Sequence, residues 1–234
     1  MSLIKRLLKI AGKENFHLDS DISAGYMWML FRKYGWMMIR GRRLALGRRH
    51  IANDIFAGRH VKILEKKKLL AGSKTTLHDF VYIDALSREG VILGEKVVLG
   101  RGTRIECSGS LSRVGKGIQI GDRTTFGNDC FFGAAGGITI GEDVIGGQYI
   151  RFHSENHNYS NLDVPIREQG VTRQGIKVGN NCWIGSGAVF LAGAELGDGC
   201  VVAANAVVTG TFPANTVIGG IPARELKKRG ERKS

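Results

Sequence analysis

Residues 176–211 read IKVGNN CWIGSG AVFLAG AELGDG CVVAAN AVVTGT, and this stretch decides the fold. An aliphatic or aromatic residue stands at every sixth position, and a glycine, alanine or threonine follows it in every unit but one, where Leu191 stands. The repeated positions are Val178, Ile184, Phe190, Leu196, Val202 and Val208. A period of six fits neither the helix period of 3.6 residues nor simple alternation. Each unit is therefore expected to form one short strand and one corner.

Weaker copies of the same unit occur upstream, and their register shifts at Ile140. The copies are found at Leu93, Leu99 and Ile105, and again at Ile120, Phe126 and Phe132. Short strands stacked in parallel about 4.8 Å apart build a solenoid whose aliphatic positions superpose into one core column. The segment Glu106–Gly117 interrupts the period and is rich in serine and glycine, so we expect a surface loop.

A second interruption, residues 151–175, is polar and holds two of the six histidines. A polar loop that projects from a rigid scaffold is where function usually resides.

Glycine and charge are the two unusual features of the composition. The chain of 234 residues has 34 glycines, only 3 prolines and a formal charge of +13. Residues 1–74 hold 17 Lys and Arg against 5 Asp and Glu, whereas residues 75–234 hold 17 against 16. A basic head on a nearly neutral body suggests an anionic partner such as a lipid surface, a nucleic acid or a phosphorylated ligand.

The cysteines and the N-terminal residues argue against a metal site, a disulfide framework and a signal peptide. The four cysteines, Cys107, Cys130, Cys182 and Cys200, lie far apart without metal-ligand spacing, so we expect no metal site and no disulfide framework. Lys5, Arg6 and Lys9 interrupt the leucines of the N-terminus, and no uninterrupted apolar stretch of signal-peptide length exists there. We expect a cytoplasmic protein.

The region before the repeats has a different character. Residues 1–11 can form a short amphipathic helix, and residues 24–43 (AGYMWMLFRKYGWMMIRGRR) combine apolar, aromatic and basic side chains. The apolar run breaks at Arg32 and Lys33, which makes it too short to span a membrane. Two interpretations stay open. Residues 1–50 form a peripheral contact with a membrane surface, or helices in this region cap the open end of the solenoid.

The repeat unit resembles the hexapeptide repeat of the left-handed parallel β-helix acyltransferases. The segments HNYSNLDVPI (157–166), IKVGNNCWIGS (176–186) and GGIPAR (219–224) further resemble the O-acetyltransferases that act on exopolysaccharide and lipopolysaccharide sugars, relatives of the maltose and galactoside acetyltransferases. The resemblance implies a mainly β fold with three repeat units per coil. We expect a helical basic region over residues 1–59, a left-handed β-helix over 60–223 with the loop insertion 151–175, and a basic tail over 224–234.

The resemblance also implies the catalytic groups. Transfer of an acetyl group to a hydroxyl needs a base, and His157 matches the catalytic histidine of the family. Ser186 matches a serine that helps to hold the oxyanion. His153 either orients the loop, binds the acceptor or has no role, and Glu155 is a candidate carboxylate for fixing a histidine tautomer. Asn128 either contacts the acceptor sugar or is a corner asparagine with positive φ.

Acetyl-CoA is the acyl donor that the resemblance implies, with no metal. The family lays coenzyme A along the outside of the C-terminal coils, between the subunits of a homotrimer whose active sites lie between chains. The candidate contacts are Trp183, Gly185, Ala203, Ala204, Thr209, Arg224 and Lys227. We expect the acceptor to be a saccharide, lipid-linked or nucleotide-linked, in the biosynthesis of exopolysaccharide, O-antigen or another surface glycan.

The same residues leave other functions open. An amino sugar or an antibiotic is an alternative acceptor, and a non-catalytic membrane-surface scaffold is the non-enzymatic alternative. A carbonic anhydrase needs three histidines around zinc, but between Asp79 and Ser234 only His153 and His157 occur. Basic residues interspersed with Met and Leu match no recognised nucleic-acid-binding motif, so nucleic acid is not expected as a partner.

Overall fold

The protein divides into two units, with the boundary after Trp36. The computed structural model describes residue 19 and residues 21–231. The amphipathic helix that the sequence predicts over residues 1–11 lies outside the described residues. The helix α2 (Ala24–Ala45) crosses the boundary between the units. No helix among the described residues is long and apolar enough to cross a membrane.

Local capping sets the ends of α2. The Ser23 hydroxyl accepts the backbone N–H of Tyr26 at 3.1 Å, which satisfies one of the free donors at the N-terminus. At the other end the Arg48 guanidinium donates to the Leu44 carbonyl at 2.6 Å, and Gly47 takes a positive φ of 72°.

The last part of α2, from Met37 on, packs on the first coil of the second unit. Met37, Gly41 and Ala45 are buried. Gly41 approaches the Ile55 carbonyl so closely that a Cβ would lie 1.9 Å from its oxygen. Arg40 Nε donates to the carbonyl of Ala57 at 2.9 Å. Residues 37–45 therefore cover the open end of the strand stack, which a solenoid requires for solubility.

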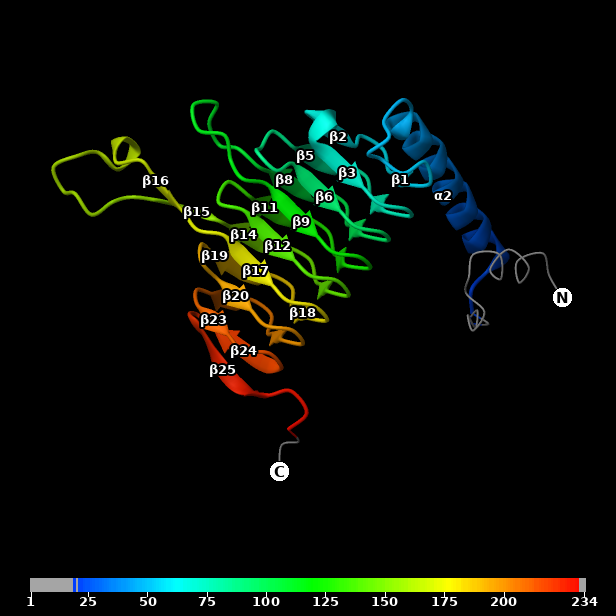
Figure 1. Cartoon of the computed structure of the whole chain (residues 1–234). Coiled ribbons are helices and arrows are strands. Elements are labelled where there is room, and N and C mark those ends of the chain that lie inside the picture. The colour runs from blue at the N-terminus through cyan, green and yellow to red at the C-terminus, as the bar shows by residue number, and fades with distance from the viewer. Residues whose placement is uncertain (1–18, 20, 232–234) are drawn as a thin grey trace. The chain divides into compact units, whose positions relative to one another are not determined.

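The second unit is a left-handed parallel β-helix with three faces (Figure 1). The first face is formed by β1 (Phe56–Ala57), β4 (Thr76–Leu77), β7 (Val98–Leu99), β10 (Thr125–Phe126), β13 (Ile145–Gly146), β18 (Trp183–Ile184), β21 (Val201–Val202), β24 (Thr216–Gly220) and the antiparallel β25 (Ala223–Lys228). The second face is formed by β2 (Lys62–Leu64), β5 (Tyr82–Asp84), β8 (Arg104–Glu106), β11 (Phe131–Gly133), β14 (Arg151–His153), β19 (Val189–Leu191) and β22 (Val207–Val208).

The third face is formed by β3 (Leu69–Ala71), β6 (Val91–Leu93), β9 (Ile118–Ile120), β12 (Ile138–Ile140), β17 (Ile176–Val178), β20 (Glu195–Leu196) and β23 (Thr211–Phe212). A fourth, two-stranded sheet pairs β15 (Glu155–His157) with β16 (Val171–Arg173) in an antiparallel hairpin. Short 3-10 helices occur at Lys66–Lys68 and Ile166–Glu168. We name the corners by the faces that they join: first–second, second–third and third–first.

The predicted core column is confirmed. The six repeated positions from Val178 to Val208 are all buried, as are the upstream copies from Leu93 to Phe132. On the inner side of the second face the rings of Phe132, Phe152 and Phe190 stack, with centroids 5.0 and 4.6 Å apart. Phe126 meets Phe132 edge-on at 5.0 Å. The four cysteines are buried and free, and Cys182 and Cys200 belong to this core.

The boundaries of the regions differ in detail from the expected ones. Parallel pairing already begins at Ile51, which bridges Ala71, so the β-helix includes residues before 60. The last strand, β25, extends to Lys228. The first residues of the expected loop 151–175 form the regular strand β14. The projecting part begins after Ser154, which is buried and accepts the Gly136 N–H at 2.8 Å.

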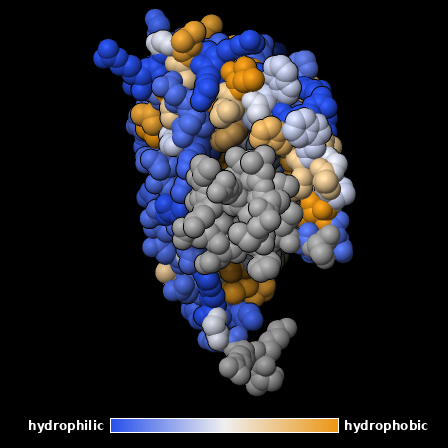
Figure 2. All heavy atoms as spheres, turned by 90° about the vertical axis from the view of Figure 1, so that its right-hand side faces the viewer, coloured by the Kyte–Doolittle hydropathy of each residue, from blue (hydrophilic) through white to orange (hydrophobic). Residues whose placement is uncertain are grey.

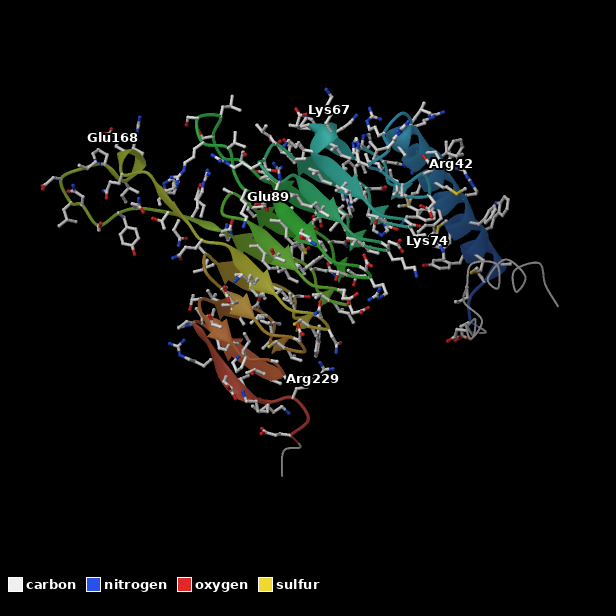
Figure 3. The ribbon with its side chains drawn as sticks, viewed as in Figure 1. Arg42, Lys67, Lys74, Glu89, Glu168 and Arg229 are labelled. Carbon is white, nitrogen blue, oxygen red and sulfur yellow. The ribbon has the colours of Figure 1, made fainter. Side chains whose placement is uncertain are left out.

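The insertions occur at one corner only among the described coils. Both the loop after β8 and the β15–β16 hairpin leave the second–third corner, and the hairpin extends far from the strand stack (Figure 1). Lys74 marks the third–first corner on the opposite side, and Glu168 marks the far end of the hairpin loop (Figure 3). Figure 2 looks onto the side of the third–first corner, where hydrophilic residues predominate among the visible ones of the β-helix.

Candidate active site

Ser186 and Asn128 lie in one column at the first–second corner. Each follows a strand of the first face and precedes one of the second face. The Asn128 Oδ1 accepts the backbone N–H of Arg101 at 3.0 Å, and the Ser186 Oγ accepts that of Gln148 at 3.1 Å. Each side chain thus accepts a hydrogen bond from the backbone at the same corner of the preceding coil. The Asp79 carboxylate makes the same kind of contact with the Arg59 N–H at 2.7 Å.

This structural role leaves the chemistry of Ser186 open. A hydroxyl that accepts one hydrogen bond still has its own O–H to donate. Ser186 is exposed, so that donor is available to an oxyanion outside the corner. At Asn128 the positive φ that one interpretation expected belongs to the next residue, Asp129, with φ 56°. Asn128 itself is exposed beside Arg101.

The candidate coenzyme contacts fall into two groups. Gly185, Ala203 and Ala204 share the first–second corner with Ser186. A Cβ on Gly185 would lie 2.5 Å from the Ala204 nitrogen, so glycine is needed here for the stacking of the coils. Trp183, in β18, is 58% exposed on the outer side of the first face, in register with Ile145 and Val201.

The remaining candidates lie at different places. Arg224 and Lys227 are exposed on β25, and Lys227 pairs in register with Val217 on the first face. Their cations thus lie on the same face as Trp183. Thr209 follows β22 and is exposed at the second–third corner, at the other end of the second face.

The hairpin positions His157. His157 ends β15, opposite Val171 of β16, and its side chain is exposed. With Tyr159 and Val164 it lines an open hollow of the loop. Asn158 donates to the Gln169 carbonyl at 3.0 Å and accepts from the Thr172 hydroxyl at 2.7 Å. The Asn158 side chain therefore braces the loop next to the histidine.

Arg173 fixes the base of the hairpin, a role that no sequence motif indicates. Its Nε donates to the Glu155 carboxylate at 2.6 Å, and its Nη atoms donate to the carbonyls of Arg113 at 2.9 Å and Val114 at 3.2 Å. The Arg173 side chain is only 13% exposed. Glu155, expected beside a histidine, is paired with arginine instead. Only the pairing of β15 with β16, which single residues do not reveal, could have indicated this contact.

His153 lies on the second face rather than in the hairpin. Its ring contacts that of Phe131, with centroids 5.5 Å apart. Burial lowers the pKa of His153 below its usual value, and the nearby charge of Arg151 lowers it further. The imidazole is therefore held in its neutral form near neutral pH. It lines a hollow with Phe131, Glu106 and Glu155.

One chain does not bring His157 and Ser186 together. The hairpin leaves from the second–third corner and extends outward, whereas Ser186 lies on the first–second corner. The second face separates them, and its width of about six residues corresponds to roughly 15–20 Å at the rise of a strand. Within the described residues, no three His, Cys, Asp or Glu side chains gather as ligands for a metal ion.

Comparison with known proteins shows which proteins the chain resembles. The bacterial transferase hexapeptide family (six repeats) matches residues 175–210. A probable acetyltransferase of Mycobacterium tuberculosis is 28% identical over 161 residues, which cover 62% of this chain and 54% of that protein. The chain thus spans about half the length of this relative.

Two further similarities cover more of the matched proteins. A putative lipopolysaccharide biosynthesis O-acetyltransferase of Escherichia coli is 29% identical over 143 residues, which cover 58% of this chain and 70% of that protein. The solved structure of a hexapeptide-repeat acetyltransferase from Vibrio cholerae, complexed with acetyl-coenzyme A, superposes with a TM-score of 0.51 at 22% identity. It covers 99% of this chain and 100% of that one, which establishes the common fold. The chain is therefore similar in sequence to hexapeptide-repeat acetyltransferases and has their fold.

Proposed function

We propose that this protein transfers the acetyl group of acetyl-CoA to a sugar hydroxyl by direct transfer, with His157 as the general base. The observation that carries the proposal is the position of His157. It ends a braced hairpin that projects from a hexapeptide-repeat β-helix, beside an open hollow. An alcohol is a poor nucleophile at neutral pH, and a positioned imidazole accepts its proton as the new bond forms.

The proposed reaction uses few groups of this chain. The imidazole of His157 takes the hydroxyl proton while the oxygen attacks the thioester carbonyl. Ser186 O–H donates to the developing oxyanion. The thiolate of coenzyme A leaves as the tetrahedral intermediate collapses, and the imidazolium returns the proton to it. Cys182 and Cys200 are buried in the core, which argues against an acyl-enzyme on either of them.

The separation of His157 from Ser186 supports an active site between chains. A hairpin that extends outward from one corner can reach the first–second corner of a neighbouring copy, and a closed ring of three copies repeats that contact. The loop tip exposes apolar side chains that such a contact would cover: Leu162 is 96% exposed and Tyr159 73%. We propose a homotrimer in which each active site combines two chains.

Coenzyme A is proposed to lie along the first–second corner and the first face of the C-terminal coils. Ala203 is half-buried and Ala204 is exposed beside Ser186, and Trp183 offers an exposed ring. The cations of Arg224 and Lys227 are the candidate partners for its phosphates. Thr209 joins this site only if the neighbouring chain contributes it.

The acceptor is proposed to be a saccharide of a surface-glycan pathway, assembled on a lipid or nucleotide carrier at the cytoplasmic side of a membrane. The similarity to the Escherichia coli lipopolysaccharide O-acetyltransferase supports this class. The exposed Trp28 and Phe31 of α2 stack with centroids 5.7 Å apart, next to the exposed Arg32 and Lys33. Aromatic rings among basic side chains suit a peripheral contact with anionic lipid.

The test of the proposed function is thiol release from acetyl-CoA across free sugars, nucleotide sugars and lipid-linked saccharides. We expect release to depend on one saccharide class and to fall on the order of 10²- to 10⁴-fold in His157→Ala, the usual contribution of a general base. Affinity for coenzyme A should stay unchanged in that variant. Near-normal turnover in His157→Ala, or no saccharide-dependent release from the wild type, would overturn the proposal.

A further inference from the structure

Bulky residues occupy an unfavourable backbone conformation at the first–second corner. His60, Phe80 and Tyr149 have φ values of 55°, 62° and 59°. A positive φ is costly for large side chains, because the Cβ approaches the following carbonyl. Other coils place small or polar residues at the same corner position: Gly102, Asp129, Gly187 and Asn205. The corner therefore accepts glycine, and folding does not account for an aromatic ring there.

The Phe80 ring lies between an imidazole and a guanidinium. The His60 ring lies parallel to it, with centroids 4.9 Å apart and an interplanar angle of 19°. On the next coil the Arg101 guanidinium lies 5.4 Å from the Phe80 centroid. Phe80 is 49% exposed, so the edge of the stack faces solvent. A cation over an aromatic face is attracted by the ring quadrupole, and this attraction limits where the guanidinium lies.

The Arg101 guanidinium has no ion-pair partner among the described residues. Two carboxylates lie nearby and are directed elsewhere. Asp79 accepts the backbone N–H of Arg59 at 2.7 Å, and Asp129 lies against Gly102. An exposed arginine that is held by an aromatic ring, without a carboxylate, suits a planar bidentate contact with a phosphate.

The stack adjoins the proposed acceptor site. The backbone N–H of Arg101 donates to Asn128 Oδ1 at 3.0 Å, and Ser186 lies two coils beyond Asn128 in the same column. At about 4.8 Å per coil, Arg101 lies roughly 14 Å from Ser186 along the corner. That distance leaves room for a sugar between an anion at Arg101 and the acetyl group.

We propose that His60, Phe80 and Arg101 form a binding site for the diphosphate of a glycosyl-diphosphate acceptor, with Arg101 as the phosphate ligand and Phe80 as its positioning residue. The inference rests on the proposed function, because it assumes that the sugar reaches Asn128 and Ser186. The same diphosphate occurs in nucleotide-linked and in polyprenyl-linked sugars. Arg59, exposed on the first coil of the same corner, adds a further positive charge.

The experiment measures binding by calorimetry to the full-length protein saturated with coenzyme A, so that the coenzyme site is occupied. The probes are uridine diphosphate and geranyl diphosphate, with uridine and geraniol as uncharged controls. We expect at least one diphosphate to bind. Uridine and geraniol should not displace the bound diphosphate. Tighter binding of the nucleotide or of the prenyl compound then identifies the carrier, and either result supports the site.

Variants distinguish binding at this site from a general effect of positive charge on diphosphate affinity. Arg101→Gln should weaken diphosphate binding on the order of tenfold to a hundredfold, the range for one charge-assisted contact. Lys96→Gln removes an equal charge from the third–first corner of the same coil and should change binding less than twofold. Phe80→Gly, compatible with positive φ, should weaken diphosphate binding without lowering the melting temperature or the affinity for coenzyme A.

Two results would overturn the inference: no diphosphate bound by the wild type, or equal losses in Arg101→Gln and Lys96→Gln. Neither depends on the proposed catalysis. A wild type that binds coenzyme A and releases thiol with a neutral sugar, yet binds no diphosphate, refutes the site alone. Absence of coenzyme A binding refutes the proposed function instead.

Discussion

Replacement of Arg173 with glutamine is expected to loosen the hairpin that carries His157 while the β-helix stays folded. The change removes a charge-assisted hydrogen bond to Glu155 at 2.6 Å and contacts with the carbonyls of Arg113 and Val114. A hydrogen bond to a charged group contributes about 1.5–3 kcal/mol, and breaking a buried pair costs about 3–5 kcal/mol. Because Glu155 is 26% exposed, solvent screens the remaining charge, and we expect about 3 kcal/mol.

Native-state hydrogen exchange measures this effect directly. The Asn158 N–H donates to the Gly170 carbonyl at 3.0 Å and reports opening of the hairpin. A loss of about 3 kcal/mol corresponds to roughly a hundredfold faster exchange. Core amides such as that of Phe152 should be unaffected, and kcat should fall with unchanged affinity for coenzyme A. The Lys177–Glu195 pair at 2.8 Å is exposed, so Lys177→Gln is the matched control. It should change the free energy of unfolding by less than about 1 kcal/mol.

Unchanged exchange at Asn158 in Arg173→Gln would refute the reasoning, as would an equal acceleration throughout the β-helix. Glu155→Gln and the double variant complete a thermodynamic cycle. The coupling free energy should be on the order of 1–3 kcal/mol if the two side chains act through their mutual contact.

Two further predictions concern the core and the second face. Phe152→Ala, in the middle of the phenylalanine stack, should lower the free energy of unfolding by about 3–5 kcal/mol in urea denaturation, and a loss below 1 kcal/mol would contradict the packing. The folded-state pKa of His153 is lowered, chiefly by burial and further by Arg151, so the unfolded chain binds this proton more tightly. Stability should therefore fall as pH drops below about 6.5. His153→Phe should flatten this dependence, and NMR should show a lower His153 midpoint that rises in Arg151→Gln.

The repeat period predicted the C-terminal coils because they contain no insertions. Lys177 pairs with Glu195 and Trp183 with Val201, so each coil has 18 residues, or three units. Upstream the pairing interval changes from coil to coil: Phe56 pairs with Thr76 and Val98 with Thr125. Extra corner residues change the spacing without removing the strands. The sequence therefore showed only fragments of a period there, although the inward-facing residues are the same in kind.

The candidate site was predictable only in part. Motif resemblance proposed His157 and Ser186 as candidates. It did not indicate the column in which Ser186 and Asn128 accept backbone N–H groups of preceding coils, because those contacts join residues 38 and 27 positions apart. Arg173 carried no local signal, since its function depends on a strand pairing and on the carbonyls of a separate loop. The separation of His157 from Ser186 follows from which corner each occupies, a property of the coil geometry and not of either motif.

A mixing experiment tests the central claim most directly. His157→Ala and Ser186→Ala chains are denatured together in equal amounts, refolded and assayed for acetyl-CoA thiol release with the identified acceptor. If each site takes the base from one chain and the oxyanion donor from its neighbour, random closed trimers should regain roughly a quarter of wild-type activity. Either variant refolded alone should stay nearly inactive. Mixed trimers that form but regain no activity would contradict the account.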